Sequence, residues 1–392
     1  MGWRLRWAAA AVAAGAAVAA VAAIVLAAVP VPARAAPGWR IETVLGGRSR
    51  PRVQAIAASG ADNAWLLGLV PIPGGPDFVI QRWDGSRWVP VTLRLQYGGP
   101  WALDSGIYTT SSGDTWVFPV LPENPGGSTV QYALRWDGSA WTASEVTAAP
   151  DTVLDAAVFS STDVWAFGET GSSAGFYTPA LVRHWNGAAW QTVPVPVGTP
   201  VSVDGVAPGD IWALGVSRAT VHRADQAMIV MHWNGTAWSA PSLPALPPAR
   251  RGYPWVATAI TAAGQDDAWV AETPAADSAG YSPGGLLLLH WNGTAWRTVA
   301  EDRALGVVTG LTPDGRGGFW LTATDPANPA AGIIADYRDG TFTSLPAPAR
   351  PGYTGTASGI VAVPGTGSFW AAGTLTPVKG GAYQTVILRY TP

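Results

Sequence analysis

Apolar and polar residues alternate in short stretches along residues 36–392, and Gly, Pro, Asp or Ser stands at most of the boundaries between them. A period of two is typical of half-buried β-strands. One unit of about 50 residues displays the pattern well. It predicts four strands, over residues 154–160, 164–168, 180–185 and 189–195.

A short sequence recurs in which Asp-Gly or Asn-Gly separates two aromatic residues. Its fullest copy covers residues 289–296, with related copies at 82–88, 135–141, 184–190 and 232–238 and a weaker one at 337–342. Such dipeptides between strands predict a type I′ turn, in which both central residues have positive φ. Each copy is therefore predicted to be two antiparallel strands joined by a tight turn.

A second marker, a tryptophan within an apolar run, precedes each hairpin. The series is Trp65, Trp116, Trp165, Trp212, Trp269, Trp320 and Trp370. Successive members are separated by 51, 49, 47, 57, 51 and 50 residues. A period near 50 residues favours the four-stranded blade of a β-propeller, in which large flat side chains fill the layers between neighbouring blades.

The two ends of the chain complement each other. The seventh unit stops after its third strand, whereas residues 38–44 resemble the fourth strand of another unit, around residues 295–299. We predict an all-β fold: a seven-bladed β-propeller of four-stranded antiparallel blades over residues 36–392, closed by an N-terminal strand that completes the last blade. Segments 53–59, 256–263 and 356–363 are rich in small residues and are predicted to be innermost strands.

Residues 1–35 have a different character. Arg4 and Arg6 precede an uncharged apolar run over residues 7–29, and Ala33-Arg34-Ala35 follows. This order predicts a secretory signal peptide cleaved after Ala35. The run is also long enough to cross a bilayer, so a retained anchor is the alternative. The expected location is extracellular, or on the cell surface through residues 7–29.

Composition narrows the possible chemistry. The chain has no cysteine, which excludes disulfides, thiolate metal sites and cysteine nucleophiles. Its formal net charge is −3, without a basic run, which disfavours nucleic acid and anionic membrane surfaces as partners. A monomer is expected. The strong preference for Ala, and for Arg over Lys, indicates a GC-rich bacterial genome.

Histidines and aspartates recur at fixed repeat positions. The slot of His184, His232 and His290 holds arginine in other units, at Arg82, Arg135 and Arg389. A slot that accepts arginine is not a metal site, and no metal or cofactor is predicted. Asp114, Asp163, Asp210 and Asp267 stand two residues before their tryptophans and are predicted to cap the turn into the second strand.

The longest irregular segments fall at second-to-third-strand and blade-to-blade connections, which emerge on the same face of a propeller. We predict that this face carries any binding site, since a rigid scaffold leaves variation to its loops. The candidate binding residues there are Trp101, Glu169, Tyr177, Arg218, His222, Tyr253, Trp255, Glu272, Tyr281 and Tyr353.

Two of these residues are also the only candidate catalytic residues. Glu169 and Glu272 follow what we take to be equivalent tryptophan strands, two blades apart. A pair of carboxyl groups about 5–10 Å apart performs acid/base work in glycosidases. The sequence does not fix their separation.

The motifs Asp-x-Trp-x-x-Gly and His-Trp-Asn-Gly-x-x-Trp carry a resemblance to secreted bacterial seven-bladed β-propellers. The chain looks similar to the kelch or galactose-oxidase-like and Asp-box-repeat groups over residues 37–392. The resemblance implies the fold and leaves the activity open. Without cysteine the Cys–Tyr cross-link of galactose oxidase cannot form, and no intact Asp box occurs.

These observations favour a non-catalytic extracytoplasmic binding or scaffold protein that recognises a glycan or a protein through its long-loop face. A polysaccharide hydrolase or lyase is one alternative, with Glu169 and Glu272 as its candidate residues. A structural cell-surface protein is another. No catalytic constellation stands out from the repeat, so the chain is not expected to be an enzyme.

Overall fold

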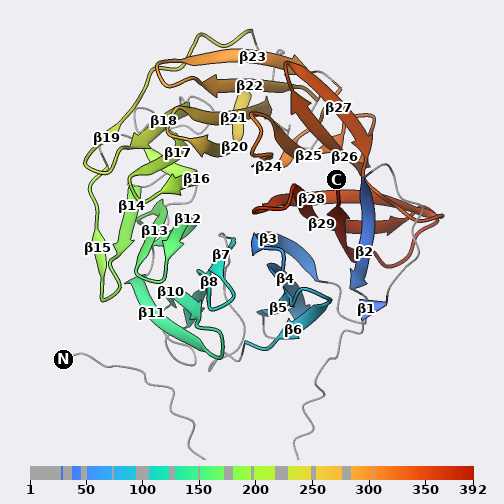
Figure 1. Ribbon diagram of the computed structural model, residues 1–392, viewed down its shortest axis with the longest axis horizontal. Helices are drawn as coiled ribbons and strands as arrows, with labels where there is room; N and C mark the ends of the chain where they lie inside the picture. Colours follow the sequence, from blue (N-terminus) through green and yellow to red (C-terminus); the bar gives the residue numbers. More distant parts are fainter. Residues whose placement is uncertain are drawn as a thin grey trace, which may run out of the picture.

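The computed structural model describes residues 28–29, 38–45, 51–72, 75–93, 106–122, 129–148, 151–171, 180–195, 198–216, 228–248, 253–275, 284–302 and 304–392. Their strands form seven antiparallel sheets, which stand around a common centre like the blades of a propeller (Figure 1). The predicted seven-bladed architecture is confirmed.

Blades 1 to 3 occupy the first half of the ring, and the strands of each follow in order from the centre outward. Blade 1 contains β3 (Arg52–Gly60), β4 (Asn63–Ile72), β5 (Gly75–Trp83) and β6 (Trp88–Val91). Blade 2 contains β7 (Ile107–Ser111), β8 (Asp114–Val117), β10 (Thr129–Trp136) and β11 (Trp141–Ala148), with β9 (Val120–Pro122) also paired to β10. Blade 3 contains β12 (Thr152–Ser160), β13 (Asp163–Glu169), β14 (Ala180–Trp185) and β15 (Trp190–Thr192).

Blades 4 to 7 complete the ring in the same strand order. Blade 4 contains β16 (Thr199–Ala207), β17 (Asp210–Val216), β18 (Met228–Trp233) and β19 (Trp238–Ser239). Blade 5 contains β20 (Trp255–Gly264), β21 (Asp267–Pro274), β22 (Leu286–Trp291) and β23 (Trp296–Asp302). Blade 6 contains β24 (Val308–Pro313), β25 (Phe319–Asp325), β26 (Asn328–Arg338) and β27 (Thr341–Pro346). Blade 7 contains β28 (Tyr353–Val363), β29 (Ser368–Pro377), β30 (Gln384–Tyr390) and β2 (Trp39–Leu45), followed by β1 (Ala28–Val29).

The innermost strands form a closed ring. Each of β3, β7, β12, β16, β20, β24 and β28 contacts the next, and β28 returns to β3 (Figure 1). The small-residue segments predicted to be innermost fall in β3, β20 and β28. Small side chains allow seven strands to approach one centre without crowding.

Segments from the two ends of the described chain lie side by side in blade 7. β2 pairs antiparallel with β30, and the register sets Trp39 opposite Tyr390 and Leu45 opposite Thr385. Of the predicted signal segment, only Ala28 and Val29 belong to the described residues; they form β1 against β2. No helix long and apolar enough to cross a membrane occurs in the described part of the chain.

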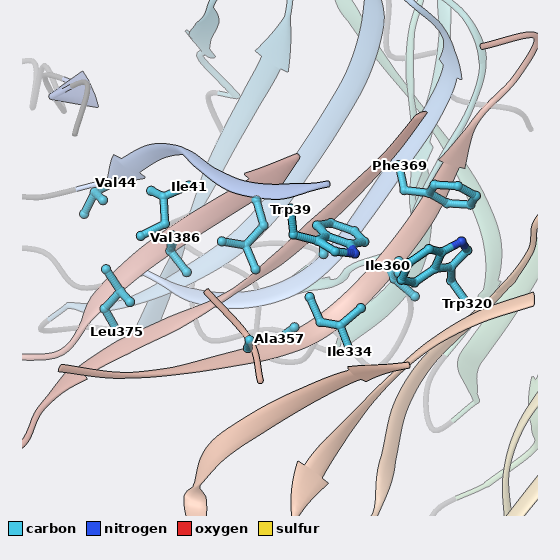
Figure 2. Packing of buried hydrophobic residues seen from close by; sticks show 13 residues of the cluster. Trp39, Ile41, Val44, Trp320, Ile334, Ala357, Ile360, Phe369, Leu375 and Val386 are labelled. Carbon is cyan, nitrogen blue, oxygen red and sulfur yellow. The ribbon is translucent and has the colours of Figure 1, made fainter. Parts of the chain in front are cut away.

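The hydrophobic core lies between blades. All seven tryptophans of the marker series are at most 6% exposed, and each contacts aromatic residues from the outer hairpin of the next blade. Trp370, for example, lies 5.0 Å from Trp83 and 5.2 Å from Trp88 between ring centroids. Figure 2 shows the corresponding layer around Trp39 and Trp320. The predicted inter-blade packing of these tryptophans is confirmed.

The hairpin turns differ from the predicted type I′ form in all but one copy. In the five main copies only the glycine has positive φ, between +88° and +100°. The preceding Asp or Asn instead accepts backbone N–H groups with its side chain: Asp84 Oδ1 lies 2.9 Å from the nitrogens of both Ser86 and Arg87. That Asx arrangement fixes the turn without positive φ at the acid. Only Asp339-Gly340 has positive φ at both residues.

The two faces of the ring are built differently. Connections between second and third strands and between blades leave on one side, here called the long-loop face. First-to-second-strand turns and the short outer hairpin turns lie on the other side, here called the turn face. This division agrees with the prediction.

Candidate functional site

Five of the predicted binding residues belong to the described part of the chain. On the side of the long-loop face, Glu169 ends β13, Trp255 and Tyr353 begin β20 and β28, Tyr253 lies two residues before β20, and Glu272 lies within β21, two residues before its end. The other five lie outside the described residues: Trp101, Tyr177, Arg218, His222 and Tyr281. Tyr253 immediately precedes blade 5 and is half-buried.

Trp255, the first residue of β20, holds a connecting segment in place. Its Nε1 donates a hydrogen bond of 3.1 Å to the carbonyl oxygen of Pro247. The half-buried ring, together with Leu243 and Leu246, packs against the core between blades 4 and 5. Trp255 therefore fixes the segment around residues 240–248 and leaves part of its indole at the surface.

Tyr353, the first residue of β28, forms a charged aromatic cluster that sequence reasoning missed. The guanidinium carbon of Arg350 lies 4.1 Å from the Tyr353 ring centroid. Arg350 also donates a hydrogen bond to Gln384. A guanidinium over an aromatic face is an attractive arrangement. No repeat marked Arg350 in the sequence, because it lies in a connection between blades.

Glu272 is the most unusual of the predicted residues. It is 1% exposed, and its Oε1 has no hydrogen-bond partner among the described residues. It lies opposite Ala257 on one side and Leu287 on the other. Burial among apolar neighbours disfavours the charged carboxylate and raises the Glu272 pKa to about 7.

Glu169 and Glu272 lie in equivalent second strands, β13 and β21, but at positions one residue apart. Glu272 faces Ala257 just before a bulge in the inner strand, the position that Gly168 takes in blade 3. Glu169 is one residue further on, four after Trp165, whereas Glu272 is three after Trp269. Counting from the tryptophan of each blade gives the same offset in the sequence.

Blade 4 also separates the two carboxyl groups. Opposite faces of a strand carry alternate residues, so Glu169 shares the side of Trp165 and Phe167, which faces blade 4. Glu272 shares the side of Val270, which faces blade 4 from blade 5. Sheets packed face to face lie about 10 Å apart. The two glutamates therefore do not come together as an acid/base pair around one bond.

The recurrent histidines and arginines belong to a repeated structural unit. The His232 ring stacks on Trp212 at 4.0 Å between centroids, and its Nε2 lies 2.7 Å from Asp210 Oδ1. In blade 2, Arg135 Nε donates to Asp114 Oδ1 at 2.8 Å. No group of three or more His, Cys, Asp and Glu side chains that could hold a metal occurs within the described ranges.

This unit corrects the role predicted for the aspartates. Asp114 accepts hydrogen bonds from the side chains of Trp116, Arg135 and Thr110, rather than from the backbone N–H groups of a turn. The acid thus links the second strand to the third through side chains. Aspartate generally favours turn capping. Here the buried indole N–H of Trp116 and the guanidinium of Arg135 on the neighbouring strand are stronger partners.

A second unpredicted group lies on the inner strands. Tyr108 donates its hydroxyl proton to Asp155 Oδ1 at 2.6 Å, and Asp155 Oδ2 accepts from the backbone N–H of Val203 at 2.7 Å. Asp204 accepts in the same way from the Ala262 N–H at 2.9 Å and the Thr261 hydroxyl at 2.8 Å. Burial raises the pKa of Asp155 to about 6. These acids connect the inner strands of blades 2 to 5.

Comparisons with known proteins support the fold. No protein-family model matches the chain, and no curated protein does either. A solved structure of YCF48 bound to a D1 peptide is 13% identical with a TM-score of 0.55, covering 92% of this chain and 97% of that one. A polysaccharide lyase of family PL25, an ulvan lyase, is 12% identical with a TM-score of 0.54, covering 88% and 95%.

The β-propeller domain of the Trilobed protease from Pyrococcus furiosus is also similar. It is 8% identical, with a TM-score of 0.51, and the match covers 86% of this chain and 93% of that one. At such low identities these likenesses establish the propeller architecture and nothing about activity.

Proposed function

We propose that this propeller is a non-catalytic extracytoplasmic binding or scaffold protein that engages a glycan or protein through its long-loop face. The observation that carries the proposal is the set of fixed aromatic and guanidinium groups there. Trp255 is held by its hydrogen bond to Pro247, and Arg350 lies over Tyr353. Tryptophan, tyrosine and arginine dominate recognition sites, and side chains already held in place lose little entropy on binding.

A polysaccharide hydrolase or lyase is the second candidate, and Glu272 is the observation that favours it. Its pKa of about 7 suits a general acid or base at neutral pH. Its burial at 1% exposure and its separation from Glu169 by blade 4 count against direct contact with a substrate. The binding function therefore fits the described side chains better.

We also propose that β2 closes the ring and that residues 1–35 direct export. The first proposal is supported by the β2–β30 pairing and the second by the charged, apolar and small-residue order of the N-terminus. An exported protein with its binding face on one side of a rigid ring suits a role at the cell surface.

The test is binding of purified residues 36–392 to a glycan array and to cell-wall and cell-surface protein fractions. Trp255→Ala and Arg350→Ala remove the two proposed contact groups, alone and together with Trp101→Ala. Val378→Ala, at a position 67% exposed just after β29, is the matched control on the same face. Binding that weakens in the first two and persists in the control supports the proposal.

Other outcomes separate the alternatives. Binding that persists in both Trp255→Ala and Arg350→Ala refutes the long-loop face. Consumption of a glycan, lost in Glu272→Gln, favours the hydrolase or lyase. Absence of any binding favours a structural role. Thermal unfolding of each variant establishes that the ring is intact.

A further inference from the structure

A groove opens between blades 2 and 3 on the turn face, away from the long-loop face. Its volume is about 270 Å³. Its lining includes Trp116, which is 2% exposed, and the more exposed Ser144, Ser161 and Thr162. Arg135 and Trp185 also line it.

The groove lies at the interface where one aromatic contact of the repeat is missing. At the other six interfaces, the third-strand aromatic lies 5.0–6.1 Å from the tryptophan of the preceding blade. These pairs are Trp83–Trp370, Trp136–Trp65, Trp233–Trp165, Trp291–Trp212, Tyr337–Trp269 and Tyr390–Trp320. The seventh pair, Trp185 and Trp116, makes no such ring contact in the described structure.

Trp185 keeps the other contacts of its repeat position. Its ring lies 5.6 Å from Trp190, and its Nε1 donates to the carbonyl oxygen of Ser161 at 3.2 Å, as Trp233 Nε1 does to that of Pro208. Trp190 alone reaches Trp116, at 6.5 Å and an interplanar angle of 88°. The space that an indole fills elsewhere in the ring is left open between Trp116 and Trp185.

The polar groups of the groove offer hydrogen bonds without net charge. The Arg135 guanidinium is neutralised by Asp114, whose Oδ1 lies 2.8 Å from Arg135 Nε. Its Nη groups have no hydrogen-bond partner among the described residues and remain available as donors. Ser144 Oγ accepts from Trp190 Nε1 at 3.1 Å, so its own hydroxyl proton is free to donate. The hydroxyls of Ser161 and Thr162 add groups that can donate or accept.

We propose that this groove binds one neutral pyranose ring, such as a terminal sugar residue of a glycan. The apolar C–H face of a sugar ring packs against an indole, and its hydroxyls match groups that both donate and accept. The volume lies below the roughly 300–1,000 Å³ of sites for drug-sized ligands, which limits the occupant to a single ring. Neutralised Arg135 gives no preference for an anion.

This site is independent of the proposed function, because it lies on the opposite face of the ring. A propeller that binds one partner on the long-loop face and a sugar on the turn face would connect that partner to the glycan. Avidity would then depend on both faces being engaged at once.

The test uses Ala143, which also lines the groove, is exposed and lies in β11 opposite Leu134. Ala143→Trp fills the space without removing a hydrogen bond. Ala240→Trp is the matched control, since Ala240 is also exposed and stands two residues after its hairpin tryptophan, Trp238, in blade 4. Residues 36–392 would be titrated with the methyl pyranosides of glucose, galactose, mannose and fucose by calorimetry and by saturation-transfer NMR.

We expect saturable binding of at least one pyranoside, weakened about tenfold or more by Ala143→Trp and changed less than about twofold by Ala240→Trp. Ser144→Ala should weaken it several-fold, and Trp255→Ala on the other face should have no effect. Three results overturn the proposal: no pyranoside binds, binding survives Ala143→Trp, or methyl galacturonide binds more tightly than every neutral sugar.

Discussion

Trp39 and Tyr390 stand opposite each other across the β2–β30 pair, with ring centroids 5.6 Å apart at an angle of 52°. Both rings contact Trp320 of blade 6, at 5.6 and 5.0 Å. Trp83 and Trp88 take the same places over Trp370, although a continuous hairpin joins them. Residues from distant parts of the chain thus reproduce the aromatic pair that a single turn provides in other blades.

Trp39→Ala should therefore destabilise the whole ring. Trp39 is 1% exposed, and truncating a buried tryptophan costs about 3–5 kcal/mol. Deletion of residues 38–45 should cost more, because it also leaves β30 without a partner. Urea unfolding measures both effects. Trp39→Phe, which keeps an aromatic ring, should lose less, and an unchanged melting temperature after the deletion would show that β2 does not hold the ring closed.

Asp155→Ala should loosen the inner ring. The carboxylate accepts the Tyr108 hydroxyl and the N–H groups of Ala156 and Val203, in strands of three blades. Removing it leaves partly buried donors unpaired, at a cost of about 2–4 kcal/mol in the free energy of unfolding. Tyr108→Phe should cost about 1 kcal/mol. The double variant should lose less than the sum; strict additivity would mean that the two groups are not coupled.

Glu272 should make stability fall as pH rises. Its pKa is about 7 when folded and has the ordinary value of 4.5 when unfolded, so folding takes up a proton between these pH values. The contribution of Glu272 to stability is fully present below about pH 4.5 and is lost as pH rises through 7, which lowers the free energy of unfolding by about 3 kcal/mol. Glu272→Gln, which cannot ionise, should remove that loss.

The measurement is the free energy of unfolding in urea at pH 5 and pH 8 for both proteins. Other titrating groups affect both proteins alike, so the informative quantity is the difference between their two pH dependences. Equal pH dependences would show that Glu272 is solvated or paired when folded.

His232→Arg should be tolerated, whereas His232→Ala should not. Arginine occupies the same slot over Trp65, Trp116 and Trp370. Alanine removes the stack on Trp212 and the partner of nearly buried Asp210, at a cost of about 1–2 kcal/mol. The arginine variant should stay within about 0.5 kcal/mol of the original in urea unfolding. Loss of stability in EDTA would contradict a purely structural slot.

The repeat made the architecture predictable from sequence. Regularly spaced tryptophans and paired hairpin aromatics report directly on inter-blade packing, because each blade must bury the same face. Blade number, inner strands and the division into two faces all followed from that regularity. A residue that every blade needs recurs at a regular spacing, so a single sequence is enough to identify it.

The departures from the repeat were harder to predict, because each of them occurs in one blade alone. Glu272 stands where blade 3 has Gly168, whose added Cβ would lie 1.9 Å from the carbonyl oxygen of Thr152. The spacing from Trp269 contains that offset, but the burial of Glu272 does not follow from the spacing. The groove beside Trp185 depends on the separation of two indoles across one interface, and Asp155 acts across blades. Neither separation nor contact between blades leaves a trace in local sequence.

The register at the two chain ends has a mechanical consequence. Because β2 and β30 are antiparallel, residue 38 and residue 391 leave the strand pair at the same end, beside Trp39 and Tyr390. Tension applied at those two points would load one backbone hydrogen bond at a time and peel the strands apart, rather than shearing all of them together. A ring held together by its buried inter-blade layers would therefore open under a small pulling force at this strand pair.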